Sequence, residues 1–120
     1  MELRGVPNFE FIENTLGGDI ASYEVLGHKV VAVHGDKDKQ ATIIPNLTMF
    51  AQQHWDMILS AHMHHFSADE SNETVFLCNG SLMGTDDYAS SLRCNSAPSQ
   101  LLIISTPKRV DNCLYKITLN

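Results

Sequence analysis

Two short, largely apolar runs that each lead into histidine constrain the fold of this chain more than any other feature. The first run, residues 29–33, is followed by His34, and the second, residues 57–59, is followed by the segment AHMHH at 61–65. Between them, residues 40–54 repeat apolar side chains at helical spacing. A strand, a crossover helix and a second strand form a parallel pair, and open α/β sheets bind ligands at the carboxyl ends of such strands. The sequence therefore predicts an α/β fold with histidines at one edge of its sheet.

Length and composition indicate one globular domain over residues 1–120, with 43% hydrophobic and 18% charged residues. The net charge of −6 argues against binding a phosphate backbone by electrostatics alone. No apolar run is long enough to span a bilayer, and the first residues lack the apolar segment of a signal peptide. We therefore expect a cytoplasmic protein without membrane contact, whose cysteines, Cys78, Cys94 and Cys113, are free thiols.

The remaining elements follow from periodicity and turn residues. We expect a short amphipathic helix over residues 8–16, stopped by Gly17-Gly18, and a second helix that begins at Thr85. Further strands are expected at residues 21–26, 29–34, 74–78, 100–105 and 113–119. The first two would form a hairpin through Gly27-His28, the last two a closing hairpin, and Asn79-Gly80 is a turn that can adopt positive φ.

Metal binding is the chemistry that the histidine pattern favours. His62 and His64 are one residue apart at a strand end, so both would lie on the same side of an extended chain. Imidazole is a common ligand of zinc, manganese, iron and nickel, and His34 would reach the same edge. The alternative is that all three are ordinary polar loop residues. His65 would point away, and His54 would lie at a helix end near the negative end of its dipole.

Three ordered segments resemble the calcineurin-like metallophosphoesterases, in their phage and bacterial phosphoesterase or nuclease branch. These segments are VAVHG at 31–35, SAHMH at 60–64 and CNGSL at 78–82, the second being similar to a GHxH motif with Ala61 in place of glycine. The resemblance covers residues 23–105, and it implies the carboxyl-terminal half of an α/β/β/α sandwich. Such a half would contain a mixed sheet with two or three helices.

The resemblance also implies roles for single residues. His34 and His62 would bind one divalent ion (manganese, zinc or iron) and His64 another, while Arg93 would contact a phosphate. The DxH and GNH motifs of the family are absent. The GDxxD motif is incomplete, because Lys39 stands where the motif has its second aspartate. Without a bridging carboxylate we expect at most one weakly bound ion, because two close metal ions repel each other. Three acids, Asp36, Asp38 and Asp69, are the local candidates to replace the missing ligands.

Three functions remain open at this point. The first is the carboxyl-terminal part of a metal-dependent phosphoesterase, acting on phosphomonoesters, phosphodiesters or nucleic acid, and inactive until an amino-terminal half completes it. The second is a non-catalytic remnant that forms homo-oligomers through apolar surface which a complete sandwich would cover. The third is a single-metal hydrolase that uses His34, His62 and His64 alone.

Overall fold

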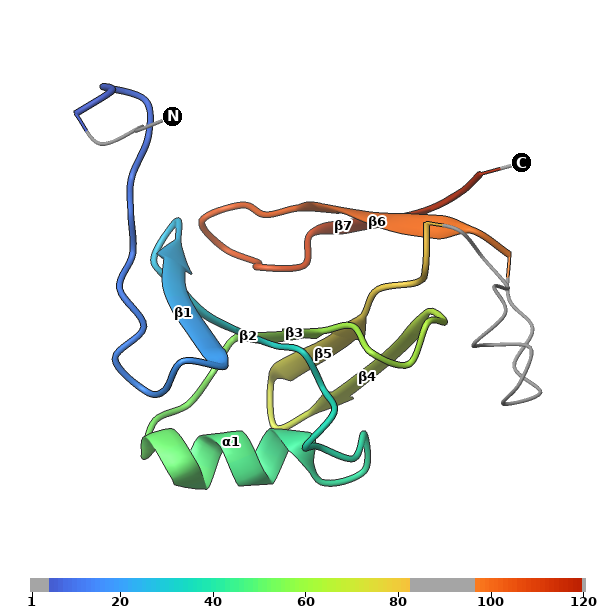
Figure 1. Cartoon of the computed structure of the whole chain (residues 1–120), viewed down its shortest axis with the longest axis horizontal. Coiled ribbons are helices and arrows are strands. Elements are labelled where there is room, and N and C mark those ends of the chain that lie inside the picture. Colours follow the sequence, from blue (N-terminus) through green and yellow to red (C-terminus); the bar gives the residue numbers. More distant parts are fainter. Residues whose placement is uncertain (1–4, 83–96, 120) are drawn as a thin grey trace.

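The computed structural model describes residues 5–82 and 97–119, which form two sheets and one helix (Figure 1). The larger sheet has the strand order β1-β2-β3-β5-β4 and consists of β1 (Ile20–Val25), β2 (His28–Val33), β3 (Met57–Ser60), β4 (Ser67–Ser71) and β5 (Thr74–Cys78). The second sheet is a hairpin of β6 (Ser99–Ile104) and β7 (Cys113–Thr118). Helix α1 (Ile43–Ala51) lies on one face of the larger sheet and the hairpin on the other (Figure 1).

The three central strands, β2, β3 and β5, run parallel, and the outer strands β1 and β4 run antiparallel to them. Because side chains alternate along a strand, the register places whole rows of residues on one face. The row toward the helix consists of Val31, Ile58 and Phe76, and the row toward the hairpin of Val30, Met57 and Val75. The mixed α/β sheet expected from the sequence is confirmed, with its central strands buried on both faces.

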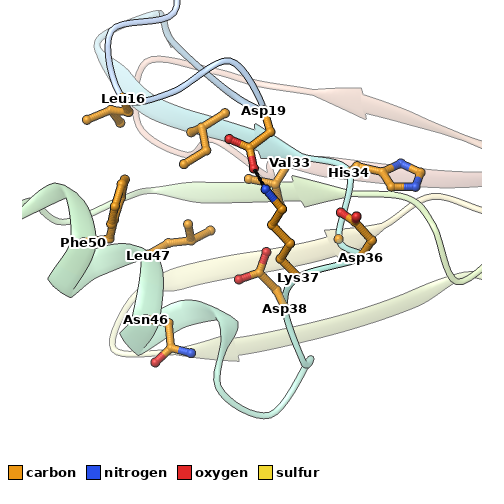
Figure 2. Close-up of a pocket in the computed structure, with 12 residues that line it drawn as sticks. Leu16, Asp19, Val33, His34, Asp36, Lys37, Asp38, Asn46, Leu47 and Phe50 are labelled. Carbon is orange, nitrogen blue, oxygen red and sulfur yellow. Dashed lines mark hydrogen bonds and ion pairs between the residues drawn. The ribbon is translucent and has the colours of Figure 1, made fainter.

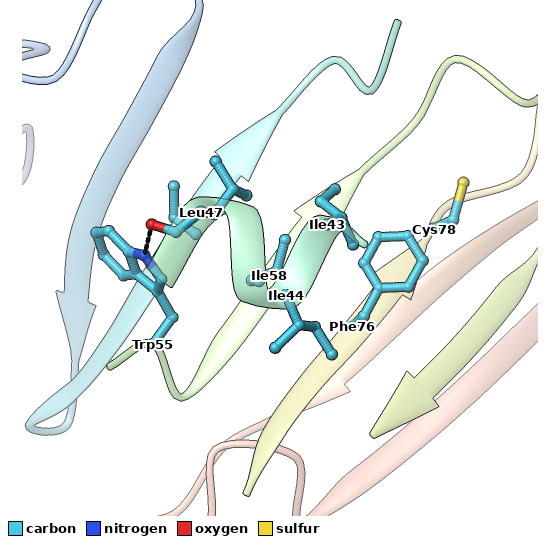
Figure 3. Packing of buried hydrophobic residues seen from close by; sticks show 8 residues of the cluster. Ile43, Ile44, Leu47, Trp55, Ile58, Phe76 and Cys78 are labelled. Carbon is cyan, nitrogen blue, oxygen red and sulfur yellow. Dashed lines mark hydrogen bonds between the residues drawn. The ribbon is translucent and has the colours of Figure 1, made fainter. Parts of the chain in front are cut away.

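Helix α1 is the crossover between β2 and β3 that the apolar spacing predicts, although it is shorter than residues 40–54. Pro45 lies in its first turn, where a missing N–H costs no hydrogen bond, and Gln52 ends it in a left-handed conformation with φ 53°. The buried Trp55 indole donates a hydrogen bond of 3.3 Å to the Leu47 carbonyl, which fixes the helix end on the sheet (Figure 3). No helix within residues 5–82 and 97–119 is long and apolar enough to cross a membrane.

Strands β1 and β2 form the predicted hairpin, with bounds shifted by one residue. The two turn residues are Leu26 and Gly27, with φ of 51° and 85°. Positive φ at both central positions is the geometry of the two-residue turn that best matches strand twist. The turn therefore sets the register that brings Val33 to the end of β2.

The predicted helix over residues 8–16 is wrong, because the structure has no helix there. Its apolar side chains Phe9, Phe11 and Ile12 are about half exposed, and a helix of this length is marginal without a surface to pack on. The described residues thus contain one helix instead of two or three. The other predicted helix, from Thr85, lies outside the described residues.

Strand β4 was not predicted, since its sequence SADES has neither apolar alternation nor β-branched residues. It is the edge strand beside β5, and its side chains are largely exposed. Acidic side chains on an edge strand discourage pairing with other chains. Its polar composition therefore fits its position, although it conceals the strand from sequence reasoning.

The Asn79-Gly80 pair joins the larger sheet to the hairpin. The Asn79 amide donates to Gln100 Oε1 at 3.1 Å, and its carbonyl oxygen accepts from the Leu101 backbone N–H at 3.1 Å. A Cβ at Gly80 would collide with the Ser99 hydroxyl. Gly80 does not have the expected positive φ. Glycine avoids this contact at a point where two segments of the chain approach closely.

Candidate metal-binding histidine pair

His34 and His62 meet at the carboxyl ends of β2 and β3. These strands are neighbours and run parallel, so their following residues leave the same edge of the sheet. The Ala61 backbone N–H donates to the His34 carbonyl at 3.0 Å, which extends the contact beyond the last strand residues. Gly35 then turns the chain with φ 105°, a conformation that favours glycine. The local fold thus brings together two residues that are 28 positions apart.

The two imidazole rings lie edge to face, with their centroids 4.8 Å apart and an interplanar angle of 71°. His62 Nδ1 and His34 Nε2 are 3.0 Å apart, so one nitrogen donates a hydrogen bond to the other. Two nitrogens bound to one tetrahedral zinc ion at about 2.0–2.1 Å would be roughly 3.3–3.4 Å apart, slightly more than this hydrogen-bond distance. The same pair of atoms therefore has a spacing compatible with two neighbouring ligands of a single cation.

The prediction that His62 and His64 share one side of an extended chain is wrong. It assumed an extended chain, but β3 ends at Ser60, and both histidines adopt left-handed conformations with φ of 52° and 61°. His64 is half-buried. His65 is exposed and donates a hydrogen bond of 3.0 Å to the Met63 carbonyl, which is consistent with a loop residue. The segment thus forms a bent loop in which each histidine has its own orientation.

Cys78, at the end of β5, holds the histidine loop by a hydrogen bond to its backbone. Its buried thiol donates to the Ala61 carbonyl at 3.0 Å, and the next backbone N–H, that of Asn79, donates to the Ser60 carbonyl at 2.9 Å. Sequence reasoning treated Cys78 only as a free thiol. The apolar run 74–78 predicts that Cys78 ends a strand, but its contact with Ala61 follows only from the pairing of β5 with β3.

Other predicted residues lie apart from the pair. Helix α1 ends before His54, whose Nε2 is 3.8 Å from Asp56 Oδ1, so His54 is not on the helix as expected. Asp69 is on the exposed edge strand β4, where its carboxylate accepts from the Glu70 N–H at 2.8 Å. Arg93, the predicted phosphate contact, lies outside the described residues.

Three residues after His34, Lys37 forms an ion pair with Asp19. Lys37 Nζ and Asp19 Oδ2 are 2.7 Å apart, and both side chains are exposed. The hydrogen bond from Lys37 is the main reason that the pKa of the Asp19 carboxyl lies below its usual value. The same bond raises the pKa of the Lys37 ammonium. Lys37 is therefore already paired and is not available as an unpaired cation for a phosphate.

The residues that the structure describes do not complete a metal site. Within 5–82 and 97–119, no group of three or more histidine, cysteine, aspartate or glutamate side chains is placed to hold an ion. Structural zinc sites have four ligands, and catalytic sites have three from the protein. Two converging nitrogens fall short of this number, so we derive no reaction step through a metal ion.

No family model and no curated protein matches this sequence. Solved structures do match its fold. Vps29 from Entamoeba histolytica, crystallised with zinc, aligns with a TM-score of 0.63 and 17% identity over 84% of this chain and 59% of its own. An archaeal phosphodiesterase gives 0.54 and 16%, over 84% and 51%. A predicted phosphoesterase from Streptococcus pneumoniae gives 0.50 and 15%, over 84% and 62%.

The chain therefore has a fold like that of Vps29 and of these two phosphoesterases. It spans between about half and two-thirds of the length of the structures that it matches. Because the sequence identities are below 20%, the likeness concerns the fold alone.

Proposed function

We propose that this chain supplies the histidine ligands of a metal-dependent phosphoesterase centre of the phage or bacterial type, acting in the cytoplasm. The observation that carries the proposal is the 3.0 Å approach of His34 Nε2 and His62 Nδ1 at the carboxyl ends of two parallel strands. In the proposal these two residues bind one manganese, zinc or iron ion, and His64 binds a second. The substrate is a phosphomonoester, a phosphodiester or a nucleic acid, and Arg93 contacts its phosphate.

The remaining ligands come from an amino-terminal half that carries the DxH, GDxxD and GNH motifs, whether that half is part of the same polypeptide or of a separate one. Two observations support this part of the proposal. The sequence lacks these motifs, and the matched structures contain a large portion that has no counterpart here. Hard oxygen ligands are the component that the histidine pair lacks. By itself the chain is therefore inactive and binds an ion weakly.

A complementation assay tests the proposal. The chain is mixed with a polypeptide that carries the three absent motifs and with manganese, and hydrolysis of bis(p-nitrophenyl) phosphate is followed. We expect activity above that of either part alone, and its loss in His34→Ala and His62→Ala. His54→Ala is the matched control, because His54 lies away from the pair. Failure of every combination to exceed the separate parts would contradict the proposal.

A second candidate function is a non-catalytic module that assembles with itself. The observation that favours it is the outer face of the hairpin, where Leu102, Ile104, Tyr115 and Ile117 are each more than 40% exposed. Paired residues of an antiparallel hairpin share a face, and the register pairs Leu102 with Tyr115. No charged side chain interrupts this set of four residues.

Sedimentation of the chain at micromolar concentration distinguishes the two candidates. The assembling module predicts a dimer or larger species that Ile104→Lys converts to monomers, whereas Ser71→Lys, on the exposed end of β4, leaves it intact. A wild-type chain that sediments as a monomer would remove this candidate.

A further inference from the structure

A cavity of ≈ 310 Å³ opens on the helix side of the larger sheet, next to the loop that follows His34 (Figure 2). Its volume is at the small end of the range for small-molecule sites. The segment before β1, the ends of β1 and β2, and one side of α1 line it. Its apolar lining consists of Leu16, Ile20, Val33, Leu47 and Phe50. Most of this lining comes from elements that the hydrophobic core already fixes in place.

The polar lining of the cavity is strongly acidic. It contains the carboxylates of Asp19, Asp36 and Asp38, the ammonium of Lys37, the imidazole of His34 and the amide of Asn46. Lys37 extends across the opening and binds Asp19 Oδ2 at 2.7 Å (Figure 2). Lys37 also interacts electrostatically with Asp36 and Asp38, but its one positive charge cannot balance three carboxylates. The cavity therefore combines an apolar interior with an excess of negative charge at its rim.

We propose that this cavity binds a small amphipathic amine, with its apolar body against α1 and its ammonium group at the carboxylates. Charge complementarity decides the class of ligand. An anion such as phosphate would face three carboxylates, and the only lysine is already paired. A neutral apolar molecule would leave the acidic rim unused. The inference involves no metal ion, and its ligand is not the phosphate ester of the proposed function, although His34 lines the same cavity.

Phe50 is the residue that would cover the apolar body of the ligand. The residue is 61% exposed although it lines the cavity, and its ring lies on the side of α1 that faces Leu16 (Figure 2). An exposed aromatic ring gains apolar contact when a ligand covers it, and its face attracts a nearby cation. Asn46, one helical turn earlier, adds an amide that can accept a hydrogen bond from an ammonium group.

Three probes with the same aromatic body and different head groups test the proposal: 2-phenylethylamine, 2-phenylethanol and 3-phenylpropanoate. Each is titrated at constant ionic strength into the full chain, labelled with nitrogen-15, and backbone amide shifts are followed. We expect the amine to shift residues 35–38 and α1, and to bind about fivefold more tightly than the alcohol, since exposed charge pairs contribute up to about 1 kcal/mol. The carboxylate should bind most weakly. Equal affinities, absent shifts in these residues, or tighter binding of the carboxylate would overturn the proposal.

Substitution of Lys37 gives a test that structural damage cannot imitate, because the expected change is a gain. Lys37→Met removes the competing ammonium and frees Asp19, so the amine should bind about two- to fivefold more tightly. Lys108→Met is the matched control, since it removes the same charge from a different pocket. Phe50→Ala should weaken all three probes. An unchanged or reduced amine affinity in Lys37→Met, or an equal gain in Lys108→Met, would overturn the proposal.

Discussion

The two sheets of this protein differ in how completely their faces are covered. In the larger sheet, Val31, Ile58 and Leu77 have no exposed surface, because α1 covers one face and the hairpin the other. In the hairpin, Leu101 and Ile103 pack inward, whereas Leu102 and Tyr115 on the outer face are 48% and 51% exposed. Both regions have apolar strands, but only one of them buries both sides.

This difference teaches where stability and function are expected to reside. Apolar burial is the dominant favourable term in folding, so the larger sheet should hold the chain together. An isolated two-stranded hairpin is marginal in water unless it packs against something else. The hairpin therefore depends on the larger sheet, and its uncovered face is the surface available to a partner. The histidine pair lies in the loops that directly follow two strands of the covered sheet, so these strands anchor the start of each loop.

The largest expected effect comes from a cavity in the covered sheet. Ile58→Ala should lower the free energy of unfolding by about 2–5 kcal/mol, because the residue is fully buried in the central strand. Ile117→Ala, on the outer face of the hairpin, should change it by less than about 0.5 kcal/mol. Urea unfolding under conditions where the chain is monomeric measures both. Equal losses would show that the two regions are equally packed.

Coupling between the sheets should give an intermediate effect. Gly80→Ala forces a Cβ onto the Ser99 hydroxyl, and Ser99 is buried, so we expect a loss of about 1–3 kcal/mol. Gly18→Ala is the control, since an added Cβ there meets no atom within 4 Å.

Adding Ser99→Gly to Gly80→Ala should restore part of the stability, because it removes the colliding atom. If the two glycine variants unfold alike, or if Ser99→Gly has no restoring effect, close approach does not explain Gly80.

The smallest effect should come from the exposed Asp19 and Lys37 pair. Since its pKa is lower in the folded chain, Asp19 contributes stability above about pH 4 that is lost as the pH falls through its folded value. The contribution is small and screened by salt, because both side chains are exposed. In Lys37→Ala the carboxyl pKa of Asp19 should rise toward 3.8, as measured by carbon-13 NMR. An unchanged pKa would show that the pair does not form in solution.

Sequence reasoning predicted the β2-α1-β3 unit, β5 and both hairpins because their apolar patterns are long and regular. It failed where tertiary context decides. The apolar spacing of residues 8–16 suits a helix, but no surface covers it, and the polar strand β4 depends on its neighbour β5. Local sequence does not contain either piece of information.

For the site, the sequence identified His34 and His62, and the structure brings them together. Parallel pairing of adjacent strands is sufficient for that prediction. The position of His64 could not be predicted in the same way, because left-handed residues at His62 and His64 break the alternation of an extended chain. The support that Cys78 gives to the loop depends on a contact with Ala61 across 17 residues, which no local motif reveals.

The central claim is that His34 and His62 act as one unit toward a metal ion, and a double-mutant cycle on zinc affinity tests it most directly. Calorimetric titration with zinc compares the wild type, His34→Ala, His62→Ala and the double variant, with His65→Ala as the control. We predict that each single variant loses more than about tenfold in zinc affinity. Removing a residue that only hydrogen-bonds a metal ligand already costs about 10–100-fold in affinity. The double variant should lose little more than either single one. Unchanged affinity in both single variants, or losses that add independently, would contradict the claim.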